Sequence, residues 1–243
     1  MARGRVHLLV VAALLAVAAL PAAPARAQDV RPNIVFVLTD DLSVDLIAHM
    51  PAVRRLARDG VSASRYIVDS SLCCPSRSSI FTGKLPHNTQ VLSNFYPLGG
   101  YSRFMEAGNA TSTFATRLQA AGYRTALFGK FLNGYRPSAD PPLTGFDEWL
   151  ATGGAGAYDG YDYTLNDGGV PRSYSTDFIN VTLADRARAF IDAWAGRQPF
   201  LLEVATPTPH APYAAARRDA GRFEHLKVPR RGAYDPLAVP DGD

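Results

Sequence analysis

Several short stretches of the sequence carry side chains that can do chemistry. They contain carboxylates, thiols, two basic groups and an imidazole, the groups that bind metals, attack as nucleophiles or move protons. In chain order they are Asp40-Asp41, Cys73-Cys74, Arg77, Lys130 and His210. What each group can do depends on its immediate neighbours in the sequence and on the elements that position it.

The two cysteines, Cys73 and Cys74, are the only ones among 243 residues, and they are adjacent. Neighbouring residues do not reach the usual disulfide separation without straining the backbone, so a structural disulfide is not expected. One alternative is that both are small buried hydrophobes, the usual state of a free cysteine. The other is that one of them is reactive.

Asp40 and Asp41 directly follow an apolar run, residues 33–39. Two adjacent carboxylates repel each other unless a cation neutralises them, and hard oxygen ligands suit calcium. The pair therefore indicates a metal site, with an exposed acidic turn as the alternative.

Lys130 and His210 each follow a short apolar segment. A lysine at a strand end is usually just solvated. His210 lies between Pro209 and Pro212, where it is either a structural loop residue or a proton donor to a leaving oxygen.

The elements that must position these residues alternate between strands and helices. Apolar runs predict strands at 33–39, 125–128 and 200–205, with a strand-like segment at 61–68. Helical periodicity predicts helices from Pro51 to Gly60, over 112–121 and over 175–195. The unbroken apolar run at 33–39 is typical of a strand covered on both faces.

This alternation predicts an α/β fold, with a mostly parallel sheet covered by helices on both faces. Such sheets carry their chemistry beyond the carboxyl ends of the strands, where the aspartates, Lys130 and His210 fall. Residues 134–173 are rich in Gly, Pro, Asp and Tyr, which predicts a long surface excursion. Its Tyr158, Tyr161 and Tyr163 either stack on a sugar or serve in packing.

Composition and the N-terminus limit the class of protein. With 47% apolar and 19% charged residues and a formal net charge of +3, the chain shows no nucleic-acid footprint. Arg3 and Arg5, an apolar stretch and then Ala25-Arg26-Ala27 predict a signal peptide over residues 1–27, hence a secreted or periplasmic protein with no membrane segment after cleavage. The alternative is an uncleaved membrane anchor.

The run Cys73-Cys74-Pro75-Ser76-Arg77 resembles the CxPSR motif of the type I sulfatases, the formylglycine-dependent branch of the alkaline phosphatase superfamily. The resemblance implies an alkaline-phosphatase-like fold and oxidation of Cys73 to formylglycine by a formylglycine-generating enzyme. The hydrated aldehyde is a geminal diol. One hydroxyl attacks sulfur, and the other later expels sulfate by re-forming the aldehyde.

The same resemblance implies roles for the residues around the nucleophile. Asp40, Asp41 and the modified Cys73 would bind Ca²⁺, and Arg77 would hold the diol and the metal-bound carboxylates through its fork of donors.

Beyond the metal, Lys130 would contact the sulfate oxygens, and His210 would meet the sulfate and the leaving oxygen. Lys130-Phe131-Leu132-Asn133 resembles the glucosamine-6-sulfatase branch, in which Leu132 stands where many sulfatases have histidine. This implies 6-sulfated glucosamine units of glycans as substrate, with Asn133 as a substitute neutral donor. The alternatives are a phosphonate or phosphodiester hydrolase of the same superfamily, or a non-catalytic glycan- or metal-binding fragment.

The resemblance extends from Arg31 to Pro212, and residues 28–243 are expected to be the N-terminal portion of a sulfatase catalytic domain. The family's later Asp-Asn-Gly metal segment has no match, since Asn166-Asp167-Gly168 has another order. We therefore expect the chain by itself to be inactive or weakly metal-binding.

Overall fold

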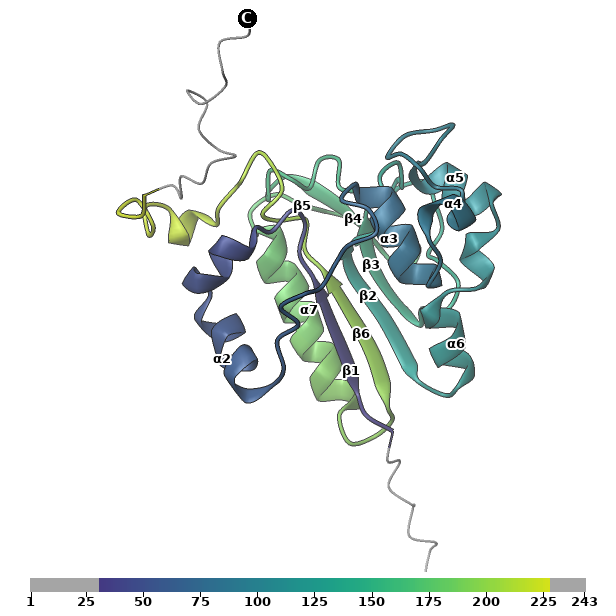
Figure 1. Ribbon diagram of the computed structural model, residues 1–243, viewed down its shortest axis with the longest axis horizontal. Coiled ribbons are helices and arrows are strands. Elements are labelled where there is room, and N and C mark those ends of the chain that lie inside the picture. Colours follow the sequence, from purple (N-terminus) through teal and green to yellow (C-terminus); the bar gives the residue numbers. More distant parts are fainter. Residues whose placement is uncertain (1–30, 228–243) are drawn as a thin grey trace, which may run out of the picture. The chain divides into compact units, whose positions relative to one another are not determined.

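A six-stranded sheet runs through residues 31–227, the part of the chain that the computed structural model describes (Figure 1). The predicted signal peptide lies outside these residues. The strand order is β1-β6-β2-β3-β4-β5. The strands are β1 (Ile34–Leu38), β2 (Arg124–Lys130), β3 (Glu148–Thr152), β4 (Tyr163–Asp167), β5 (Val170–Tyr174) and β6 (Phe200–Ala205).

Pairing is parallel among β1, β6, β2 and β3, and antiparallel from β3 to β4 and from β4 to β5. The predicted α/β fold with a mostly parallel sheet is thus confirmed. Its helices are α2 (Pro51–Asp59), α3 (Cys73–Thr82), α4 (Pro86–Thr89), α5 (Gly100–Glu106), α6 (Phe114–Ala120) and α7 (Ile179–Trp194), with 3-10 turns η1 (Val44–His49), η2 (Asn109–Thr111) and η3 (Arg217–Asp219).

Each face of the central strands has its own apolar core, and Figure 1 shows α7 on one side of the sheet and α3 and α6 on the other. On the α7 side, Leu183, Ala187 and Phe190 are spaced to form one stripe that packs on Phe128 and Leu202. The other core holds Phe81 of α3 and Leu127 of β2, with an aromatic cluster between them. Helices on both faces of β2 and β6 are therefore confirmed.

The prediction of a surface excursion over 134–173 is wrong. This stretch holds β3, β4 and β5, and Trp149, Tyr163 and Leu165 are buried in the core. Gly and Pro punctuate the stretch so closely that each strand has only five residues, too few to show a clear period.

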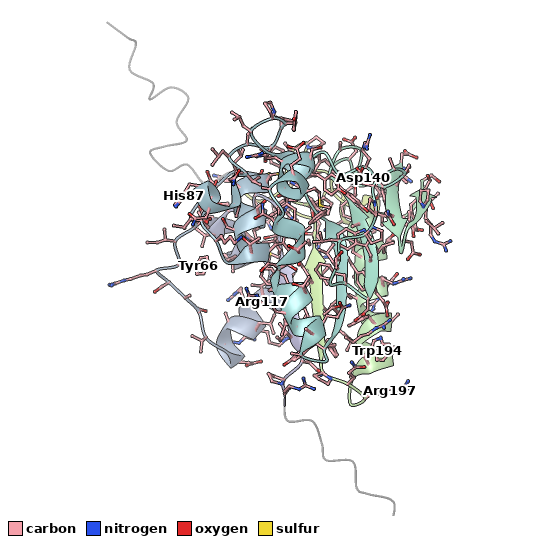
Figure 2. All side chains as sticks on the ribbon, turned by 90° about the vertical axis from the view of Figure 1, so that its right-hand side faces the viewer. Tyr66, His87, Arg117, Asp140, Trp194 and Arg197 are labelled. Atoms are coloured by element: carbon pink, nitrogen blue, oxygen red, sulfur yellow. The ribbon has the colours of Figure 1, made fainter. Side chains whose placement is uncertain are left out.

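The expectations for the first strand and for residues 61–68 also need correction. β1 is an edge strand of the described sheet, and Val35 and Val37 are 49% and 60% exposed rather than covered. Residues 61–68, all within the described range, form no strand, and Ile67 is 87% exposed. Figure 2 shows Tyr66 of this segment at the outside of the packed helices. An apolar run reveals strand propensity but not which neighbours cover the strand.

Candidate active site

Parallel pairing brings the ends of β1, β6 and β2 to the same edge of the sheet (Figure 1). Two backbone hydrogen bonds then tie together the loops that follow β1 and β6. Thr206 N donates to the Leu38 carbonyl over 2.9 Å, and Asp40 N donates to the Thr208 carbonyl over 3.2 Å. The sequence-predicted residues on these loops are consequently neighbours in space.

Asp40 is the centre of the site. It is 4% exposed, and its two carboxylate oxygens accept hydrogen bonds from different cations. Arg77 Nη2 lies 3.2 Å from Oδ1, and Lys130 Nζ lies 2.6 Å from Oδ2. Arg77 also donates through Nη1 to the backbone carbonyl of Lys130 over 2.7 Å. Buried charges persist only when paired, so these three residues hold one another in place.

Lys130 stays charged in spite of its burial. Removal from water and the nearby Arg77 guanidinium each lower the pKa of Lys130, but the attraction and hydrogen bond of Asp40 outweigh them. The net result is a pKa above the ordinary lysine value. A fully buried ammonium is thus available at the end of β2.

The two adjacent cysteines have different surroundings. Cys74 is fully buried, and burial raises the pKa of its thiol to about 11 although the Asn133 backbone N–H partly opposes this. Cys73 is half-buried, and its Sγ lies 4.0 Å from Asp40 Oδ1. Cys74 therefore fits the description of a buried hydrophobe, and Cys73 is the cysteine that faces the charged cluster.

Helix α3 sets the relation of Cys73 to Arg77. The helix begins at Cys73 and ends at Gly83, whose φ of 69° lies in the left-handed region. Pro75 falls in the first turn, where a missing N–H costs nothing. Arg77 lies four residues after Cys73, so both side chains are on the same helix face. The Cys74 N–H, one of the unpaired donors of the first turn, donates to Asn94 Oδ1 over 2.7 Å.

Asp41 and His210 lie on the outer side of the cluster. The side chain of Asp41 is 54% exposed, and its Oδ2 is 3.7 Å from His210 Nε2. Asp41 adopts a φ of 59°, a backbone conformation that Asp tolerates better than most residues. This turn directs the two adjacent aspartates differently, so that Asp40 is buried and Asp41 faces solvent.

A metal-binding group of the expected kind is present, with somewhat different members. One ligand atom each from Asp40, Cys73 and His210 lie within 4.8 Å of one another. This group includes His210 and omits Asp41, whereas the sequence prediction paired Asp40 and Asp41 with Cys73.

The donor chemistry fits calcium in part. A carboxylate with a thiol and an imidazole is a mixed set, whereas calcium prefers six to eight oxygens. If the oxygens of a diol replace the sulfur of Cys73, and Asp41 also contributes, the set contains more of the oxygen ligands that a hard cation prefers.

Sequence reasoning missed several neighbours of the site. Tyr158 stacks on His210 with ring centroids 4.0 Å apart, whereas Tyr163 is buried in the core and Tyr161 packs on Phe178. Glu203 is a fully buried carboxyl on β6. These residues sit in a Gly-rich loop and an apolar strand, where the sequence around them carries no motif.

Asn133 contacts the second cysteine of the pair. Its Oδ1 accepts from Cys74 Sγ over 3.4 Å, and its backbone N–H donates to the same sulfur over 3.2 Å. These contacts hold the first turn of α3 through Cys74, and the role of Asn133 as a neutral donor stays a prediction.

Comparisons with known proteins agree with this geometry. The family model described as Sulfatase matches residues 32–235. N-acetylglucosamine-6-sulfatase of Homo sapiens is 34% identical over 219 residues, which cover 84% of this chain and 39% of the human protein. The extracellular sulfatase SULF-1 homolog of Drosophila melanogaster is 34% identical over 223 residues, covering 88% of this chain and 20% of that protein.

A solved structure of BT4656 in complex with its substrate D-glucosamine-2-N,6-O-disulfate superposes with a TM-score of 0.69 at 27% identity, covering 83% of this chain and 39% of that one. Within residues 31–227 no helix has both the length and the apolar character that crossing a membrane requires. The chain spans about two fifths of the length of the human relative that it matches. With a family match across most of its length and an alkaline-phosphatase-like fold, the chain belongs to the sulfatase family.

Proposed function

We propose that this chain carries the nucleophile and the sulfate-binding cations of a sulfate-ester hydrolase, and that 6-sulfated glucosamine units of glycans are its substrates. The observation that carries the proposal is the convergence of Cys73, Arg77, Lys130 and His210 on the buried Asp40. This convergence occurs in a chain whose family model is that of the sulfatases.

The nucleophile in this proposal is formylglycine, made by enzymatic oxidation of Cys73 before folding. Its hydrate would place two hydroxyl groups near the present position of Sγ. One hydroxyl attacks sulfur and the alcohol leaves, which gives a sulfated intermediate. The second hydroxyl then loses its proton, the aldehyde re-forms and sulfate departs. An unmodified serine or cysteine ester has no such exit.

Three side chains would then stabilise the charge that develops during the reaction. Arg77 and Lys130 are fixed by Asp40 and by each other, so they stabilise negative charge on the sulfuryl oxygens without having to reorganise. His210, half-buried beside Asp41, would donate a proton or hydrogen bond to the leaving oxygen.

Asp40, Asp41 and the modified Cys73 are the residues that would hold Ca²⁺, with His210 next to them. When bound, the cation would lower the cost of forming an oxygen nucleophile beside two carboxylates. The match of donor types is partial, as described above, and no step of the proposal depends on a particular coordination geometry.

The substrate class rests on relatives. The human and Bacteroides thetaiotaomicron relatives are named for 6-sulfated N-acetylglucosamine, and BT4656 was solved with a 6-O-sulfated glucosamine. Extracellular sulfatases among the relatives support the proposed export of this protein, to the periplasm or the medium, after removal of residues 1–27.

The adjacent cysteines offer a matched pair of variants that tests this function. The full-length protein that contains this chain is produced together with a formylglycine-generating enzyme, and release of sulfate from N-acetylglucosamine 6-sulfate is measured. Cys73→Ala should abolish hydrolysis, because no diol can form. Cys74→Ser should retain most of it, because this position is the variable one of CxPSR and a hydroxyl can keep the contacts to Asn133.

The other functions give different results in the same assay. Faster cleavage of a phosphodiester or phosphonate ester than of the sulfate ester would favour the related hydrolase class. An unmodified Cys73 in protein from the native host, together with intact calcium binding, would favour a non-catalytic binding module. Hydrolysis of the sulfate ester by Cys73→Ala at the same rate as an active wild type would contradict the proposed nucleophile.

A further inference from the structure

Tyr158 occupies a position between two of the charged groups of the site. It lies in the loop that joins β3 to β4, and its ring stacks on the His210 imidazole with centroids 4.0 Å apart and planes inclined by 13°. Lys130 Nζ lies 5.0 Å from the centroid of the same ring, within the range of a cation–π contact. One side chain thus touches both the ammonium at the end of β2 and the imidazole after β6.

The loop around Tyr158 is built for this close packing. Gly154 has a φ of 97°, and a Cβ at this position would lie 2.5 Å from the Tyr158 hydroxyl oxygen and 3.3 Å from Lys130 Cε. Only a glycine leaves room there for both side chains. The Tyr158 hydroxyl is itself buried, and Lys130 is the polar side chain that acts on it.

The surroundings of this hydroxyl shift its pKa. Burial raises the pKa of Tyr158, whereas the nearby Lys130 lowers it by a smaller amount, so the group stays a neutral phenol. Because the hydroxyl is covered by protein atoms, it is not placed to touch a substrate. Its ring, by contrast, is in contact with His210.

His210 has little else to fix its ring. Nδ1 lies 2.6 Å from the carbonyl oxygen of the next residue, Ala211, and Nε2 lies 3.7 Å from the solvent-exposed Asp41. Both of these groups are on exposed loops. The stacked phenol is the contact that comes from a half-buried side chain, whose hydroxyl is covered by protein atoms.

We propose that Tyr158 is a positioning residue, whose ring holds the His210 imidazole and the Lys130 ammonium at a fixed separation so that both face Cys73. Its meaning for catalysis rests on the sulfate-ester hydrolysis proposed above, but the geometric claim does not. Tyr158 acts through the two groups and makes no contact with the substrate.

The geometric claim is tested by nuclear magnetic resonance on the full chain labelled at histidine. A phenol stacked on an imidazole shifts the ring C–H signals of the imidazole upfield, and His210→Asn identifies those signals. We expect the upfield shift in wild type and in Tyr158→Phe, and its loss in Tyr158→Leu. Tyr161→Leu, a nearby loop tyrosine that packs on Phe178, is the matched control and should leave the shift unchanged.

The catalytic claim is tested by steady-state kinetics on a sulfate ester with the same variants of the full-length protein. Loss of the ring should lower kcat by about tenfold to a hundredfold with a smaller change in KM, because misplaced catalytic groups penalise the transition state. Tyr158→Phe, which keeps the ring, should have a kcat close to that of wild type. Tyr158→Met replaces Tyr158→Leu if the latter does not fold, since it fills a similar volume without an aromatic ring.

The outcomes separate this inference from the proposed function. His210 signals that are the same in Tyr158→Leu as in wild type would overturn the positioning role, whatever the activity. A fall in kcat that is equally large in Tyr161→Leu would also overturn it, because the effect would then be one of general stability. A full-length wild-type protein that carries formylglycine but cleaves no sulfate ester would contradict the proposed function, while the resonance measurement would still decide the role of Tyr158.

Discussion

Around Lys130, at the end of β2, the strand residues are buried, whereas Asp41, just beyond the end of β1, has 54% of its side chain exposed. β2 lies between β6 and β3 with a core on each face, and β1 lies at the edge with Val35 and Val37 exposed. The site therefore joins a rigid inner side, containing Lys130 and Arg77, to an open outer side, containing Asp41 and His210.

This difference suits the proposed chemistry. Groups that stabilise developing charge are most effective when they are fixed before the reaction, and the inner side provides that through Asp40. A sugar and a metal need access, which the outer side provides. Tyr158 connects the two sides, because it touches Lys130 on one and His210 on the other.

The largest expected effect comes from the core of the inner side. Phe131 is fully buried and packs edge to face on Phe81, Phe104 and Trp149. Phe131→Ala should lower the free energy of unfolding by about 3–5 kcal/mol, through lost burial and the cavity left behind. Val37→Ala on β1 is the matched edge variant, with an expected change within about 0.5 kcal/mol. Urea denaturation of both variants measures the contrast, and similar losses would show that β1 is as well packed as β2.

The adjacent aspartates provide the next contrast. Asp40→Asn removes the charge that Arg77 and Lys130 share and should cost about 3 kcal/mol or more of unfolding free energy, because two buried cations lose their counter-charge. Asp41→Asn should change stability by less than about 0.5 kcal/mol, since the side chain is exposed and Asn also tolerates a positive φ. Thermal unfolding of both variants at neutral pH is the measurement. Equal effects would mean that the inner charge cluster does not contribute to stability as described.

A pH-dependent effect, absent below pH 4.5, is expected from Glu203, which lies on β6 between the two sides. Its register partners are Phe36 on β1 and Leu127 on β2. Burial raises the pKa of Glu203 to about 8 from an ordinary value of 4.5, and the Arg77 charge offsets only part of this. Between these values the folded state keeps a proton that the unfolded state loses. The contribution of Glu203 therefore destabilises the fold progressively from pH 4.5 to 8 and is constant above that.

Glu203→Gln isolates this contribution. The free energy of unfolding of wild type, taken relative to the variant, should fall by up to about 1.4 kcal/mol per pH unit between pH 5 and 8. Denaturant titrations of both proteins across this range measure the difference. A difference that does not vary with pH would show that Glu203 is ionised in the folded protein, with a cation close enough to keep it so.

The strands and the long helix that position the site could be predicted because their apolar patterns are local. Residues 200–205 were expected as a strand and are β6, and the helix expected over 175–195 contains α7. By contrast, α3 has no apolar stripe, since its sequence CCPSRSSIFT mixes small and polar residues. The edge position of β1 depends on long-range pairing, which no local pattern encodes.

The site shows the same division. Asp40, Lys130 and His210 could be brought together from the rule that parallel strands present their ends at one edge. The opposite exposures of Asp40 and Asp41 could not, because they depend on a single positive φ. For Tyr158, Tyr161 and Tyr163 the sequence predicts the same two alternatives, stacking on a sugar or packing. Only the fold distinguishes Tyr158 from the other two.

The central claim concerns position 73, and mass analysis of the peptide that spans Cys73 to Arg77 tests it most directly. The peptide should be taken from active protein exported by its native host. We expect the mass of formylglycine in place of one cysteine, with fragmentation assigning the change to residue 73 and leaving Cys74 as a thiol. An intact thiol at Cys73 in protein that cleaves sulfate esters would contradict the account.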